Sequence, residues 1–203
     1  MSIIAKYSLN WDANDSSGNG YNGTPTNVTY DSPLISSWQS VLLSWTNSHI
    51  VINNALWLTT SSNNTLAFTI KSTSGSWTQY ILDWCTTSWG NRRIVLYSVS
   101  WILYIYSSWA SWSSTWLNIV NKKLRICLVH TPSTDYVYVN GALLTSISSG
   151  TTGIAYNQLW LWTPVDSLLV AQFIWNIDEV ITRNEILSVA QVKNDYLFYN
   201  WFM

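Results

Sequence analysis

Apolar and polar residues alternate with a period of two along most of the chain, and short turn-rich segments separate the alternating runs. Such alternation is typical of strands that bury one face, because successive side chains of a strand point to opposite sides. In the run 66–71, for example, Leu66, Phe68 and Ile70 share one face. The pattern predicts strands at 3–9, 40–44, 49–53, 66–71, 79–83, 93–98, 102–107, 123–130, 136–140, 142–147, 158–161, 168–173 and 176–181. The pair Asn140-Gly141 predicts a tight hairpin turn between two of these strands.

One helix is expected, near the end of the chain. Thr182 and Glu185 have the spacing of a capping box, in which two side chains satisfy backbone N–H groups at the start of a helix. Apolar residues follow at roughly helical spacing to about Tyr196. Many short strands and one short helix predict an all-β fold, a two-sheet antiparallel jelly-roll sandwich with one short C-terminal helix. No repeat or linker divides residues 1–203, so we expect a single domain.

The charge balance narrows the range of partners. Charged residues make up 9% of the chain, and Lys+Arg 9 nearly balance Asp+Glu 10. Nucleic-acid binding needs clustered positive charge and is therefore not expected. No apolar run approaches the ~18 residues of a membrane span, so membrane insertion is not expected either. The N-terminus lacks the pattern of a secretory signal peptide. Cys85 and Cys127 lack the spacing of a zinc or redox motif.

Tryptophan and glycine occur in unusual numbers, 15 and 8 respectively. Several tryptophans, such as Trp11, Trp45 and Trp84, have polar, turn-like neighbours, where glycine is the usual residue. We hypothesise that many of these codons are UGA, which the source reads as glycine, and that they were translated as tryptophan. Glycine at all 15 tryptophan positions would give 23 glycines. The alternative is a genuinely tryptophan-rich protein with an aromatic platform for a ligand.

Four segments together resemble a known family. Segment 7–24 reads YSLNWDANDSSGNGYNGT, 42–51 reads LLSWTNSHIV, 136–141 reads YVYVNG and 173–180 reads FIWNIDEV. In this order they resemble laminin G-like domains of the concanavalin A-like lectin/glucanase superfamily, with Trp11, Trp45 and Trp175 where those domains have glycine. The resemblance implies a jelly roll whose first and last strands are adjacent. It also implies carbohydrate binding or adhesion, often with bound calcium.

A metal site is predicted in the acidic loop after the first strand. Asp12 and Asp15 lie there among several asparagines, and calcium prefers carboxylate, amide and carbonyl oxygens. The resemblance implies that an acidic residue of the last strand, here Asp178, completes the site. Ca²⁺ is the cofactor that these three residues would hold. The alternative is that Asp15 and the asparagines only stabilise turns.

An enzyme is not expected. Glycosidases need two carboxyl groups at a defined separation, and Glu179 and Glu185 are the two glutamates of the chain. Glu179 follows Asp178 directly, so we expect these two side chains on opposite faces of a sheet. His49 and His130 lie in alternating strands outside any recognisable catalytic motif.

A ligand would be held by loops at the rim of the sandwich. The candidate residues are Asn91, Arg92, Tyr104 and Tyr106. Tyr104 and Tyr106 share one face of their strand, as do Tyr136 and Tyr138, and both pairs are favoured as core residues over a sugar platform. The loops 73–78, 86–91 and 107–116 are predicted to form the variable part of this rim.

These features predict a non-catalytic carbohydrate-binding or adhesion module of lectin type, whose partner is a glycan or glycoconjugate. An alternative of a different class is a structural virion or surface protein, such as a phage tail or decoration subunit. In that role the sandwich would make protein contacts within a homo-oligomer or a virion. A glycoside hydrolase ranks third. A virion or a cell surface is the location that these roles favour.

Overall fold

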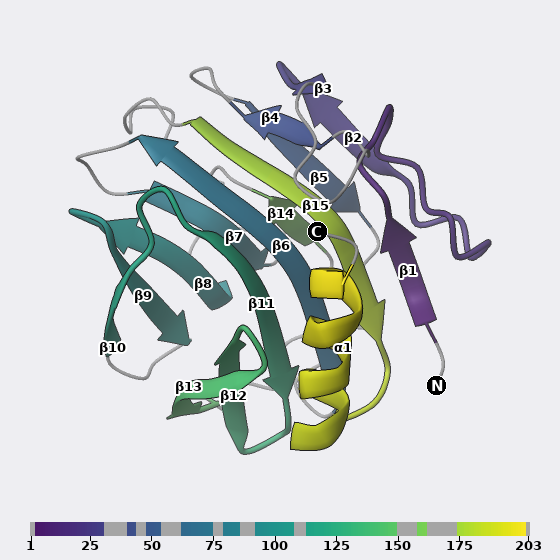
Figure 1. Cartoon of the computed structure of the whole chain (residues 1–203). Helices are drawn as coiled ribbons and strands as arrows, with labels where there is room; N and C mark the ends of the chain where they lie inside the picture. The colour runs from purple at the N-terminus through teal and green to yellow at the C-terminus, as the bar shows by residue number, and fades with distance from the viewer. Residues whose placement is uncertain are drawn as a thin grey trace.

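The chain forms two stacked antiparallel β-sheets with one helix packed against the outside (Figure 1). The computed structural model describes residues 3–30, 40–43, 48–53, 62–74, 79–85, 92–107, 113–149, 158–161 and 174–201. Within these residues there are fifteen strands and one α-helix. The predicted all-β jelly-roll sandwich with a short C-terminal helix is therefore confirmed.

The eight-stranded sheet contains the first and the last strand of the described chain. Its strands run in the order β13 (Ala142–Ser148), β12 (Thr134–Val139), β11 (Lys123–His130), β6 (Asn64–Ser74), β15 (Ile174–Arg183), β4 (Val41–Leu43) and β3 (Thr29–Tyr30), and β1 (Ile3–Tyr7) also pairs with β15. Lys6 lies opposite Ile181 and Tyr7 opposite Val180. The expected adjacency of the first and last strands is confirmed.

The seven-stranded sheet forms the second layer. Its order is β10 (Ser113–Asn118), β9 (Ile102–Ser107), β8 (Arg92–Val99), β7 (Gln79–Cys85), β14 (Gln158–Leu161), β5 (His49–Asn53) and β2 (Gly23–Thr26). The strands β2, β3 and β10 were not predicted, and β10 occupies part of the predicted rim loop 107–116. The predicted strand 168–173 lies outside the described residues.

The main core lies between the two sheets. Leu66, Phe68 and Ile70 of β6 are buried there, as their alternation predicts, together with residues such as Leu96 of β8 and Ile105 of β9. Since one face of each strand fills this core, the other face of each sheet carries the remaining side chains.

The helix α1 (Val189–Trp201) covers part of the outer face of the eight-stranded sheet (Figure 1). A second, smaller apolar cluster fills this junction and consists of Ala67, Cys127, Val129, Tyr138, Leu187 and Val192. Burial raises the pKa of the Cys127 thiol to about 12, which makes this cysteine an inert part of the cluster. No helix in the described part of the chain is long and apolar enough to cross a membrane.

The predicted start of the helix is wrong. The strand β15 continues through Thr182, whose hydroxyl accepts a hydrogen bond from the backbone N–H of Ala5 at 3.1 Å. The capping box lies further on: the Gln191 side-chain oxygen accepts the Ser188 N–H at 2.8 Å, and the Ser188 hydroxyl accepts the Gln191 N–H at 3.3 Å. The predicted pair Thr182/Glu185 and the observed pair Ser188/Gln191 have the same spacing. Only the second pair lies wholly beyond the end of β15, where the chain can turn.

Candidate functional site

A row of tyrosines lies on the outer face of the seven-stranded sheet. The core-facing residues of β9 are Leu103 and Ile105, so the alternate residues point outward. Tyr80, Tyr97 and Tyr104 are direct cross-strand neighbours. The ring centroids of Tyr97 and Tyr104 are 5.2 Å apart, and those of Tyr80 and Tyr97 are 5.9 Å apart. We refer to these three residues as the tyrosine row.

The outer rings of this row remain accessible while the central hydroxyl is shielded. Tyr97 is 3% exposed, whereas Tyr80 and Tyr104 are partly exposed. Burial, together with the neighbouring Tyr104 and Tyr80, raises the pKa of the Tyr97 hydroxyl above its ordinary value. This hydroxyl therefore stays protonated, and the partly exposed rings of Tyr80 and Tyr104 are the ones that the row presents to solvent.

A second aromatic group lies on the same face, toward β5. Trp160 of β14 is the cross-strand neighbour of Asp83 on one side and Val51 on the other. Its ring lies 5.0 Å from that of His49. The Trp160 indole N–H donates to the Gln158 side-chain oxygen at 3.1 Å, and the Gln158 amide donates to the Asn53 side-chain oxygen at 2.7 Å. Aromatic rings and amides thus share a single face, in which the Asp83 carboxyl group is buried.

The rim candidates from the sequence are only partly brought together. Tyr104 and Tyr106 both lie on this outer face, so their expected core position is wrong. Tyr136 and Tyr138 instead pack in the cluster beneath α1. Arg92 is the first residue of β8, where its backbone pairs with Cys85, and its side chain is outside the described part. Asn91 lies outside the described residues.

The contacts of the acidic loop match the alternative in which Asp15 and the asparagines stabilise turns. The Asp15 carboxylate accepts hydrogen bonds from the backbone N–H groups of Lys6, Ser17 and Tyr21. Burial alone would raise the pKa of this carboxyl group, but these hydrogen bonds and the Ser17 hydroxyl hold it below its ordinary value. Asp12 accepts both N–H donors of Asn14 nearby.

Asp178 lies in a different setting, on the outer face of the eight-stranded sheet. Its cross-strand neighbour is Thr69, and it is 1% exposed. Burial and the nearby Glu179 raise the pKa of the Asp178 carboxyl group to about 8. In the described part of the chain, no group of three or more His, Cys, Asp or Glu side chains could hold a metal ion. Calcium stays a prediction for Asp12, Asp15 and Asp178.

The sequence predicts that Asp178 and Glu179 face opposite sides of the sheet, and this prediction is wrong. A bulge interrupts the pairing between Asp178 and Ile181, and Glu179 has a φ of 49°. The Glu179 carboxylate reaches the Tyr199 hydroxyl of α1 at 3.4 Å, on the same outer face as Asp178. Asp178 is nevertheless buried, so a polymeric sugar cannot approach the pair as it approaches a glycosidase.

Each of the two histidines packs against the ring of a tryptophan. His130 is 1% exposed and pairs with the equally buried Asp135, while the ring of Trp84 packs edge-on against it. This pair lies in the core and is inaccessible to a substrate. His49 packs against Trp160.

No family model and no curated protein matches the chain by sequence. Solved structures match its fold. The binding domain of Paraclostridial Mosquitocidal Protein 1 has a TM-score of 0.77 and 14% identity over 97% of this chain and 52% of that chain. A Trypanosoma rangeli sialidase mutant with trans-sialidase activity has a TM-score of 0.80 and 14% identity over 98% of this chain and 33% of that chain.

A third match is a structure of botulinum neurotoxin type C, whose cell entry depends on interaction with two ganglioside molecules. Its TM-score is 0.70 and its identity 17%, over 100% of this chain and 51% of that chain. The chain thus spans about half or less of each of these proteins. At such identities the matches establish the fold alone, a jelly-roll sandwich of the concanavalin A-like kind.

Proposed function

We propose that this chain is a non-catalytic carbohydrate-binding module of lectin type that binds glycans on the outer face of the seven-stranded sheet. The observation that carries this proposal is the tyrosine row, with Tyr106 and Trp160 on the same face. The apolar face of a sugar ring stacks on an aromatic side chain, while its hydroxyl groups need neutral donors and acceptors. Tyrosine hydroxyls and the Gln158 amide are groups of this kind.

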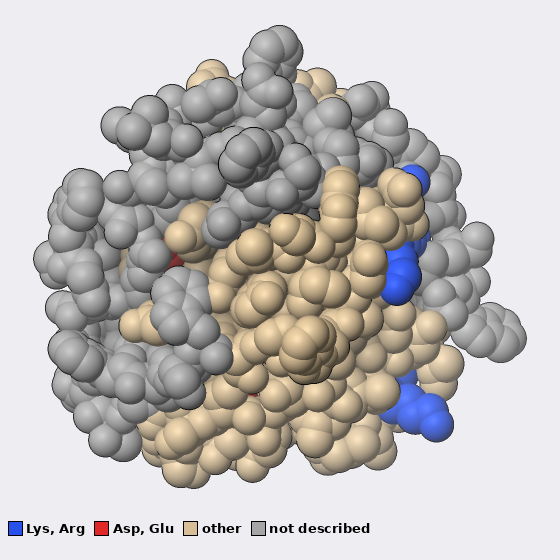
Figure 2. Space-filling view, turned by 90° about the vertical axis from the view of Figure 1, so that its left-hand side faces the viewer, with Lys and Arg blue, Asp and Glu red and all other residues tan. Residues whose placement is uncertain are grey.

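Among the described side chains of this face, the charge favours a neutral glycan, because the acidic residue Asp83 is 1% exposed. Figure 2 shows the edge of the sandwich at which β9 and β10 lie, and few of the described atoms seen there belong to charged side chains. The Lys and Arg side chains in this view gather at the right-hand margin, toward the face that α1 covers. A binding face of this composition would rely on stacking and hydrogen bonds, and its affinity would depend little on salt.

The structural relatives add independent support. One is named as a binding domain, and another enters cells through gangliosides, which are lipids that carry sugars. The finer laminin G-like assignment belongs to the same proposal. It is supported by the order of the four sequence segments and by the pairing of β1, which leads into the first segment, with β15, which carries most of the last. Calcium is tested separately, by thermal melts with chelator and with added calcium; no shift in either would remove the metal from the proposal.

The recoding hypothesis is supported at some tryptophans and opposed at one. Trp101 and Trp116 have φ values of 75° and 56°, in the region that favours glycine, and Trp116 is 85% exposed. Trp84, whose neighbours predicted a turn, lies instead within β7 and is 1% exposed in the core. An exchange of tryptophan for glycine is therefore best supported at positions with a positive φ, such as 101 and 116.

A glycan array followed by calorimetry with the best ligand tests the proposal. The Tyr104→Ala variant should bind at least about tenfold more weakly, because one stacking ring is lost, and tenfold corresponds to about 1.4 kcal/mol. The matched control is Tyr136→Ala, which removes a half-buried tyrosine from the other sheet. Circular dichroism checks that both variants fold. Equal glycan affinity in Tyr104→Ala and the unmodified chain would overturn the assignment of this face.

A structural role in a virion or surface assembly remains the alternative, and exposed apolar side chains favour it. Leu143 of β13, Ile186 and Val189 are 54%, 46% and 61% exposed. Large exposed apolar side chains are common at protein contacts when they are contiguous. A stable homo-oligomer in light scattering, combined with no binding on a glycan array, would favour this role over the lectin.

A further inference from the structure

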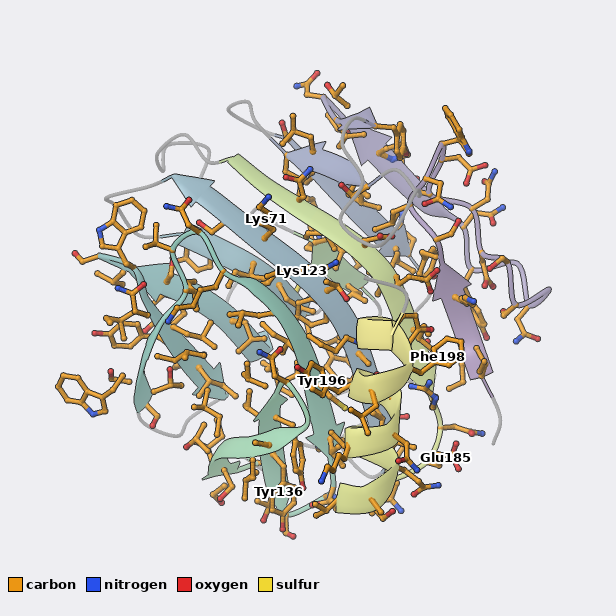
Figure 3. All side chains as sticks on the ribbon, in the orientation of Figure 1. Lys71, Lys123, Tyr136, Glu185, Tyr196 and Phe198 are labelled. Carbon is orange, nitrogen blue, oxygen red and sulfur yellow. The ribbon has the colours of Figure 1, made fainter. Side chains whose placement is uncertain are left out.

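A pocket of about 300 Å³ lies at the junction of α1 with β15, away from the tyrosine row. The helix contributes Gln191, Asn194, Asp195 and Phe198, and Arg183 enters from β15. Gln191 is three and four positions before Asn194 and Asp195, and Phe198 is four and three positions after them, so the four residues form one stripe along the helix. Figure 3 shows Phe198 on the side of α1 that faces β1.

The lining of the pocket includes one positive and one negative side chain, Arg183 and Asp195, and Arg125 contacts Asp195 from outside the lining. The two carboxylate oxygens of Asp195 are each taken by an arginine: Arg125 Nε donates to one at 2.9 Å and Arg183 Nη2 to the other at 3.1 Å. The single negative charge of Asp195 thus pairs with two guanidinium groups. Glu179, the next acidic side chain, contacts Lys6 at 3.7 Å and the Tyr199 hydroxyl at 3.4 Å.

The Arg183 guanidinium has an unused donor. Its Nη1 is buried and has no hydrogen-bond partner among the residues that the structure describes, and Arg183 as a whole is 9% exposed. A buried charged donor without a partner costs free energy, and an anionic oxygen would recover that cost with a charge-assisted hydrogen bond. A planar guanidinium matches the geometry of a carboxylate better than that of a single-atom anion.

The remaining lining has the character of a sugar contact. The Phe198 ring is 59% exposed, so it presents apolar area at the mouth. The Gln191 side-chain oxygen accepts from Ser188 in the helix cap, which leaves its NH₂ group to donate, and Asn194 adds an exposed amide one turn before Phe198. An aromatic ring, two amides and a guanidinium together can hold a ring with hydroxyl groups and one carboxylate.

We propose that this pocket is a second binding site, which takes a carboxylate-bearing sugar unit of the uronate type. The carboxylate meets Arg183, the apolar face of the sugar covers Phe198, and the amides of Gln191 and Asn194 meet the hydroxyl groups. Since Nη1 is shielded without a ligand, binding includes a side-chain rearrangement at the mouth. The site does not depend on the proposed glycan face, which lies on the other sheet.

Titration of the whole chain with glucuronate, followed by NMR chemical shifts, tests this site. Glucose, acetate and phosphate serve as comparison ligands. Glucuronate should bind at millimolar concentrations and perturb residues of α1 and β15, while glucose should not bind there. Equal responses to glucuronate and acetate would overturn the sugar class, and equal responses to phosphate would reduce the site to a general anion site. No response to glucuronate would overturn the pocket as a binding site.

Variants that leave the Arg183–Asp195–Arg125 contacts intact make the test specific. Phe198→Ala should weaken glucuronate binding at least about fivefold, because it removes the exposed ring from the pocket mouth. Leu197→Ala is the matched control: Leu197 is 40% exposed on the same helix and does not line the pocket. Equal weakening in both variants, or loss of glucuronate binding in Tyr104→Ala, would overturn the placement. Failure of this test leaves the glycan-array result for Tyr104→Ala unaffected, and the reverse holds too.

Discussion

The hairpin turn between β8 and β9 should become more stable when its second residue is changed from tryptophan to glycine. The turn consists of Ser100 and Trp101, with φ values of 47° and 75°, because Val99 pairs directly with Ile102. The turn Asn140-Gly141 between β12 and β13 has nearly the same values, 52° and 78°. Both have the positive φ at two central residues that a type I′ turn requires, and glycine is the favoured second residue.

The expected gain follows from two opposing terms. A residue with a Cβ in the left-handed region costs roughly 1–2 kcal/mol relative to glycine. Glycine in turn increases the conformational freedom of the unfolded chain, which costs about 0.4–1 kcal/mol. The net effect of Trp101→Gly is therefore a stabilisation of about 1 kcal/mol, or a rise in Tm of about 2–4 °C for a domain of this size.

Thermal and urea denaturation of three variants separates the backbone effect from the loss of the indole. Trp101→Ala removes the indole and keeps a Cβ, so it should gain nothing from the backbone. Trp84→Gly changes a core residue of β7 and should destabilise the fold by at least about 3–5 kcal/mol. A Tm of Trp101→Gly at or below that of Trp101→Ala would refute the reasoning about this turn.

Three further outcomes follow from buried or paired charges. Because burial raises the pKa of the Asp178 carboxyl group to about 8, the folded chain holds a proton that the unfolded chain releases above about pH 4. Stability should therefore fall as pH rises from about 4 to 8, and Asp178→Asn should lose this slope in urea melts; an unchanged slope would contradict the assignment. Asp135→Ala removes the carboxylate that pairs with the buried His130 ring and should cost about 1–3 kcal/mol in urea denaturation; a loss below about 0.5 kcal/mol would show that this contact contributes little to stability. Lys71 lies directly opposite Lys123, so Lys71→Glu should raise stability by about 0.2–1 kcal/mol in thermal melts at low salt; the same gain at high salt would argue against a charge effect.

The strands could be predicted from the sequence where every second residue, and therefore one face of the strand, is strongly apolar. Leu66, Phe68 and Ile70 are found on the core side of β6, as predicted, and Asn140-Gly141 forms the expected turn. The short strands β2 and β3 were missed because pairing with a neighbour, rather than local composition, makes them strands. Propensity alone carries little weight for such edge segments.

The site was less predictable, because it depends on which phase of a strand faces the core. In β9 both phases carry large side chains, and the packing of Leu103 and Ile105 against the other sheet turns Tyr104 and Tyr106 outward. The bulge at Glu179 had no signature in the sequence, and it reverses the expected orientation of this side chain. Spacing alone could not distinguish the pair Thr182/Glu185 from the pair Ser188/Gln191. The second pair sets the start of α1 and therefore the position of the pocket beside this helix.

The central position of β15 has a consequence for synthesis. This strand pairs with β6 on one side and with β4 and β1 on the other, and the hydrogen bond between Ala5 and Thr182 joins residues 177 positions apart. While the ribosome is still making residues before 174, the strands β1, β4 and β6 have no shared partner and expose open backbone edges. The nascent chain is therefore expected to fold late and slowly, and to need protection from self-association until its last strand emerges.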